Sequence, residues 1–199
     1  MDLSIALSAF TLLFFAEMGD KSQLLVMTLA HRYHPSPVIA GSFAAFALLN
    51  LLAVAVGQAL FDWLPQGWLL LVAACLFLFF GVRSWQEANQ GAEDAEIPAR
   101  SRGGFMQSFL LIFVAELGDK TQLAMLALAA STGDPWAVLV GGTLALWSVS
   151  LIGILFGCTL LRRLPTHWVQ RAAALLFIGF GLLALTQLLI NGAVAEIQG

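Results

Sequence analysis

Residues 17–23 read EMGDKSQ, and residues 116–122 read ELGDKTQ. Over the wider windows 14–24 and 113–123, eight of eleven positions are identical. Both copies lie inside long apolar runs, where each charged side chain costs about 2.5–3.5 kcal/mol on membrane insertion. Carboxylates in two matched copies at such positions predict an ion site that is split between two halves of the chain.

The composition is that of a membrane protein. Of the 199 residues, 60% are hydrophobic and 11% are charged, whereas about a quarter of the residues of a soluble domain are charged. Each of six apolar segments is long enough for a helix that crosses about 30 Å of hydrocarbon. These segments lie near residues 3–30, 37–60, 67–86, 105–130, 136–160 and 167–190. We expect the lipid bilayer, and no nucleic acid, as a partner.

The repeat extends beyond the motif, since with an offset of 100 residues Gly41 matches Gly141. We therefore predict an all-α membrane protein with six transmembrane helices in two three-helix repeats. The repeats span residues 1–86 and 105–199, and a linker at residues 87–104 joins them. Because three is odd, the second repeat enters the membrane from the opposite side, which makes the two an inverted repeat.

The arginines predict the orientation. All seven fall on the side of the membrane that carries the linker, and the other side has none. The positive-inside rule places that side in the cytoplasm. Both termini are then expected to face outward.

On an unbroken helix, Glu17, Asp20 and Lys21 lie on one face, and Gln23 widens that stripe. Gly19 lets another helix or an ion approach the backbone closely. The second copy has the corresponding residues Glu116, Gly118, Asp119, Lys120 and Gln122. Asn50, in the second apolar segment, is a further candidate for a ligand or a supporting hydrogen bond.

The charge balance favours a cation site over a purely structural set of ion pairs, in which each lysine would pair with its own glutamate. Two lysines cannot neutralise four carboxylates, so a charge of −2 remains if all six groups ionise. One divalent cation or two protons would cancel it, which suggests that metal and protons exchange. Carboxylate and amide oxygens are hard ligands that suit Mn²⁺, Ca²⁺ or Mg²⁺. Candidate ligands are therefore the four motif carboxylates, with the amides of Gln23 and Gln122.

The duplicated pattern Glu-x-Gly-Asp-Lys-Ser/Thr in two three-span halves resembles the cation exporter family that includes human transmembrane protein 165 and bacterial manganese exporters. The resemblance covers essentially the whole chain, and both motif copies match. It implies export of Mn²⁺, or in some members Ca²⁺, in exchange for H⁺, and the short linker and compact size resemble a bacterial inner-membrane member. If the roles of the family's motif residues apply at the matching positions, the metal-binding carboxylates are Glu17, Asp20, Glu116 and Asp119. The residues that shape the site are Lys21, Ser22, Gln23, Lys120, Thr121 and Gln122.

The sequence thus predicts a secondary transporter, not an enzyme, with the metal as its substrate and no tightly bound cofactor. Three alternatives stay open. The same carboxylates could line a passive divalent-cation channel, the motifs could only clamp a membrane scaffold together, or the paired acids could hold the ammonium group of an exported amino acid. The preference between Mn²⁺ and Ca²⁺ and the oligomeric state do not follow from the residues.

Overall fold

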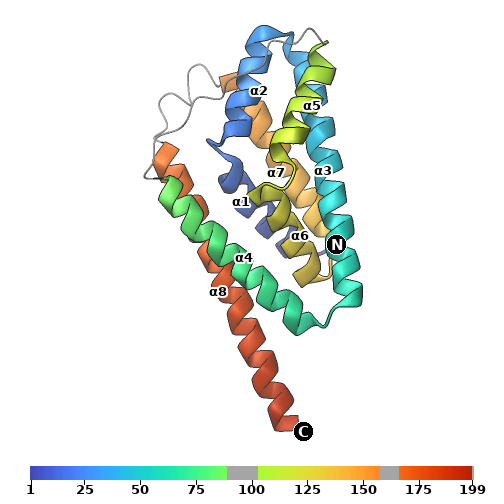
Figure 1. Cartoon of the computed structure of the whole chain (residues 1–199), viewed down its shortest axis with the longest axis vertical. Coiled ribbons are helices and arrows are strands. Elements are labelled where there is room, and N and C mark those ends of the chain that lie inside the picture. The colour runs from blue at the N-terminus through green and yellow to red at the C-terminus, as the bar shows by residue number, and fades with distance from the viewer. Residues whose placement is uncertain (89–102, 157–165, 199) are drawn as a thin grey trace.

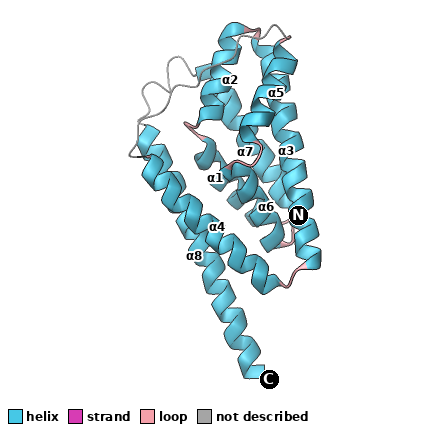
Figure 2. Cartoon of the chain, viewed as in Figure 1, coloured by secondary structure: helices cyan, strands magenta, loops and turns pink. Residues whose placement is uncertain are grey.

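The computed structural model describes residues 1–88, 103–156 and 166–198. Within these ranges the chain forms helices and no strand (Figure 2). The helices are α1 (Leu3–Glu17), α2 (Lys21–Arg32), α3 (Pro35–Trp63), α4 (Gln66–Glu87), α5 (Gly104–Glu116), α6 (Lys120–Thr132), α7 (Pro135–Phe156) and α8 (Thr166–Gln198). The predicted linker at residues 87–104 lies mostly outside the described residues.

The first and fourth apolar segments are broken helices. The chain leaves α1 at Glu17 and enters α2 at Lys21, and the two helices are bent by 73°. In the second copy α5 ends at Glu116 and α6 begins at Lys120. The expectation of one unbroken helix through each motif is therefore wrong, and the motif residues do not share a single helical face.

A tight turn causes the first break. Met18 has φ −66° and ψ 120°, and Gly19 has φ +81°. The N–H of Asp20 donates to the carbonyl oxygen of Glu17 at 3.1 Å. These are the features of a type II β-turn, whose third residue needs a positive φ that glycine adopts without steric cost.

The second motif forms the same turn. Leu117 has φ −65° and ψ 111°, Gly118 has φ +81°, and the N–H of Asp119 donates to the carbonyl oxygen of Glu116 at 3.1 Å. Equal sequence therefore gives an equal local structure in both halves.

Within the described part of the chain, four helices are long and apolar enough to cross a membrane: α3, α4, α7 and α8. The bent pair of α1 and α2 makes a fifth candidate span, and α5 is a shorter apolar helix. The length and apolar composition of these helices are those of an integral membrane protein.

The two halves pack into each other. In Figure 1 the chain runs upward through α1 and α2, and downward through α5 and α6. The broken helix of each half packs against the long second helix of the other half: α1 and α2 contact α7, and α5 and α6 contact α3. The last helices of the halves, α4 and α8, pack along each other. This exchange brings the two helix breaks into one bundle.

Equivalent glycines allow this close packing. A Cβ on Gly41 in α3 would collide with Ser108 Oγ and with the carbonyl oxygen of Phe105 in α5. A Cβ on Gly141 in α7 would collide with the carbonyl oxygen of Ala6 in α1. Both collisions involve backbone, which cannot move aside cheaply, so the sequence match between these glycines reflects matched helix contacts.

The turn geometry predicts that alanine destabilises the protein at the turn glycine Gly118 but not at a glycine inside a helix. We expect Gly118→Ala to lower the free energy of unfolding by about 1–2 kcal/mol, because a side chain disfavours the left-handed φ. A Cβ there meets no heavy atom within 4 Å, so any loss of stability comes from the backbone conformation and not from a steric clash. Thermal unfolding of the purified protein in detergent measures it.

Gly179→Ala is the matched control. Gly179 lies within α8, and a Cβ there also meets no heavy atom within 4 Å. Because alanine favours the helix more than glycine does, this change should be neutral or stabilise by up to about 1 kcal/mol. Equal stabilities of the two variants would contradict the assigned turn.

Candidate metal centre at the two helix breaks

The helix breaks place four carboxylates at helix ends. Asp20 and Asp119 occupy the N-cap positions of α2 and α6, where the partial positive charge of a helix favours an anion. Glu17 and Glu116 are the last residues of α1 and α5. A helix C-terminus carries partial negative charge, so it adds to these carboxylates in favouring a cation.

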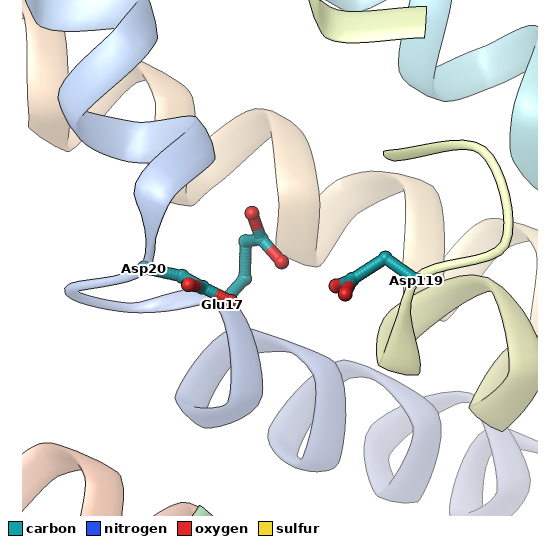
Figure 3. Close-up of side chains that lie close together, drawn as sticks. All are labelled: Glu17, Asp20 and Asp119. Carbon is teal, nitrogen blue, oxygen red and sulfur yellow. The ribbon is translucent and has the colours of Figure 1, made fainter. Parts of the chain in front are cut away.

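Three of the four predicted carboxylates converge. Glu17, Asp20 and Asp119 each offer a carboxylate oxygen, and these oxygens lie within 4.8 Å of one another. Figure 3 shows Glu17 and Asp20 on the first break and Asp119 reaching toward them from the second. The group is therefore built by both halves of the chain and could hold one metal ion.

Glu17 is the most deeply buried member of the group. Its exposed fraction is 1%, and neither carboxylate oxygen has a hydrogen-bond partner. A buried charge without a partner is strongly unfavourable, so such a group needs a nearby cation or a proton. The position is suited to binding a positive ligand.

The lysines of the two motif copies differ in environment. Lys120 forms an ion pair with Asp20, so its partner belongs to the other half of the chain. Its equivalent, Lys21, has an exposed side chain. In the purely structural alternative, each lysine pairs with the glutamate of its own motif. The structure instead pairs Lys120 with Asp20 of the other motif.

The fourth carboxylate, Glu116, is not part of the group of three. It is buried, and its Oε2 accepts a hydrogen bond from the hydroxyl of Thr121 at 3.3 Å. In the first copy, the hydroxyl of Ser22 is buried without a partner. The two motifs therefore have equal backbones and unequal side-chain contacts.

The motif glutamines hold the turns. Gln23 Oε1 accepts from the N–H of Gly19 at 2.7 Å, and Gln122 Oε1 accepts from the N–H of Gly118 at 2.6 Å. Gln23 Nε2 also donates to the carbonyl oxygen of Val149 in α7 at 3.1 Å. Sequence reasoning proposed the glutamines as ligands and missed this supporting contact. The signal for the turn was the glycine two residues after each motif glutamate, Gly19 after Glu17 and Gly118 after Glu116.

Asn50 connects the second helices of the two halves. It is buried, and its Nδ2 donates to the hydroxyl of Thr143 in α7 at 3.1 Å. This bond joins α3 to α7, and the predicted role of Asn50 at the metal site stays a prediction.

Comparison with known proteins gives one family. The family model described as "Divalent cation/proton antiporter GDT1" matches the chain twice, at residues 5–92 and 104–191. A GDT1-like protein of Synechocystis sp. is 33% identical, over 89% of this chain and 97% of its own length. A Vibrio cholerae protein named "Putative manganese exporter" is 33% identical over 88% of both chains. GDT1-like protein 3 of Arabidopsis thaliana is 25% identical over 87% of this chain and 67% of its own length. No solved structure matches the chain.

The glutamine contacts predict unequal effects of one substitution at equivalent positions. Gln23→Ala removes two hydrogen bonds at a buried site, so we expect it to lower the free energy of unfolding by about 1–3 kcal/mol. Gln122→Ala removes one bond and should cost less. Thermal unfolding in detergent compares the two variants, and an equal or larger loss in Gln122→Ala would contradict the cross-half contact to Val149.

Proposed function

Because the chain belongs to the GDT1 family of divalent cation/proton antiporters, we propose that it exports a divalent cation from the cytoplasm in exchange for protons. Mn²⁺ is the first choice of substrate and Ca²⁺ the second. The metal is cargo, held only while it crosses. One observation carries the proposal: the buried carboxylate of Glu17 has no hydrogen-bond partner and lies beside the carboxylates of Asp20 and Asp119.

Charge counting supports the exchange. If Glu17, Asp20 and Asp119 are ionised and Lys120 is protonated, the group carries −3 + 1 = −2. One divalent cation cancels this charge, and so do two protons. Either occupant removes the cost of moving a charged site through a low-dielectric environment, so each can replace the other.

The ligand type supports the choice of metal. The group offers only carboxylate oxygens from the described residues, and hard oxygen ligands suit Mn²⁺ and Ca²⁺ better than thiolate-seeking ions. The relative from Vibrio cholerae carries manganese export in its name. We therefore rank Mn²⁺ above Ca²⁺.

We further propose six spans in two inverted repeats, with α1–α2 and α5–α6 each counted as one broken span. Secondary transporters with inverted repeats bind substrate near the midplane, where broken helices meet. The opposite chain directions of the two broken helices fit this plan (Figure 1). In a bacterial inner membrane, the arginine-rich side would face the cytoplasm and both termini would face outward.

The test is Mn²⁺ uptake into proteoliposomes driven by an imposed pH step. With an acidic interior, the protein should accumulate Mn²⁺ above equilibrium while protons leave. Glu17→Gln and Asp119→Asn should each slow uptake by about 10–100-fold, the range seen when residues that support a metal are lost. Asp62→Asn is the matched control, because Asp62 is an exposed acid that bonds Gln58 outside the group.

Two outcomes would reject the proposal. Mn²⁺ that only equilibrates, whatever the direction of the pH step, would identify a passive channel. Uptake that is unchanged in Glu17→Gln and Asp119→Asn would place transport at another site.

A further inference from the structure

The chain contains only two lysines, and they occupy equivalent positions in the two motifs. Lys21 is exposed, whereas the side chain of Lys120 is 16% exposed and its Nζ is paired with Asp20 Oδ2. The pair joins the N-terminal end of α6 to that of α2, and so crosses from one half of the chain to the other. Lys120 of the second half is thus paired with Asp20, an acid that the first half contributes to the candidate metal centre.

Both oxygens of Asp20 are already engaged. Oδ1 accepts from the backbone N–H of Lys21 at 2.7 Å, which caps α2, and Oδ2 binds the Lys120 ammonium. In contrast, both oxygens of Glu17 lack a partner. A divalent cation between Glu17, Asp20 and Asp119 needs an oxygen of Asp20. A cation on either oxygen of Asp20 would lie next to the Lys120 ammonium on the same carboxylate. Two neighbouring positive charges repel each other strongly in a poorly solvated site, so metal binding favours departure of the ammonium.

We propose that Lys120 is a tethered competitor of the transported metal. Its ammonium binds Asp20 when no divalent cation is bound and moves off Asp20 when one binds. This proposal rests on the proposed function and adds a residue that sets substrate affinity. The competition weakens metal binding, which favours release on the far side, and the returning ammonium keeps the two helix breaks connected after release. Lys120 acts on the metal through Asp20, as a positioning residue and not as a ligand.

Metal affinity tests the competition. Mn²⁺ is titrated calorimetrically into the purified full-length protein in detergent. Lys120→Met should lower the Kd for Mn²⁺ about tenfold or more, because it removes a positive charge next to the metal. Lys120→Arg keeps the charge and should leave the Kd within about threefold of the parent value. A merely structural role of Lys120 would not explain tighter Mn²⁺ binding in Lys120→Met. Weaker or unchanged Mn²⁺ binding in Lys120→Met would overturn the proposal.

Lys21→Met is the matched control, since it deletes the same charge at the equivalent exposed position. Its Kd should change by less than about threefold, because Lys21 is exposed, whereas Lys120 is paired with the candidate ligand Asp20. A tightening equal to that of Lys120→Met would mean that net charge alone sets the affinity, and this would also overturn the proposal.

Chemical labelling tests the contact between Lys120 and Asp20, and its Asp20→Asn arm needs neither metal binding nor transport. An amine-acetylating reagent followed by mass spectrometry reads both lysines in one molecule, with Lys21 as the internal reference. Asp20→Asn should raise labelling of Lys120 several-fold relative to Lys21, and it keeps the helix cap because asparagine is as good an N-cap as aspartate. Mn²⁺ should raise it in the parent protein. If neither change affects Lys120, the proposal fails.

The two proposals fail separately. Absence of pH-driven Mn²⁺ uptake in the parent protein rejects the proposed function, whereas the labelling of Lys120 in Asp20→Asn still decides whether the ammonium is held by Asp20. Normal uptake with no tightening in Lys120→Met rejects the competitor alone.

Discussion

The left-handed backbone of Gly19 and Gly118 is the constraint on which the rest of the structure depends. A residue with φ near +80° cannot continue a helix, so each motif turns sharply and begins a new helix at once. The turn places a glutamate at the end of one helix and an aspartate at the start of the next. Two such turns from opposite halves then bring carboxylates of both halves into one group. The backbone groups freed by each turn are bonded by the motif itself, through the aspartate or glutamine side chains.

The two motifs are nearly identical in sequence and distinct in surroundings. Glu17 is buried without a partner, whereas Glu116 accepts a bond from Thr121. Lys120 reaches the other half, whereas Lys21 is exposed. Local sequence therefore fixes the backbone of each turn, and packing between the halves decides which side chains meet.

Several features were predictable from the residues because they are local or periodic. The hydropathy pattern predicted an all-helical membrane protein, and the motif predicted its family; both are confirmed. The helix breaks were not predicted, because an apolar run signals a span whether or not the helix through it is continuous, and Gly19 was interpreted as a place where a helix or an ion can approach the backbone closely. The pairing of Lys120 with Asp20 could not be predicted, since it depends on how two segments a hundred residues apart pack. The ligand roles of the four carboxylates and the two glutamines stay predictions.

The central claim is that one divalent cation binds between the halves, on Glu17, Asp20 and Asp119. The most direct measurement is anomalous X-ray scattering from crystals of the full-length protein soaked with Mn²⁺. The expected result is a single manganese peak within bonding distance of carboxylate oxygens from all three residues. A peak bound by acids of only one half, or one located away from both helix breaks, would contradict the claim.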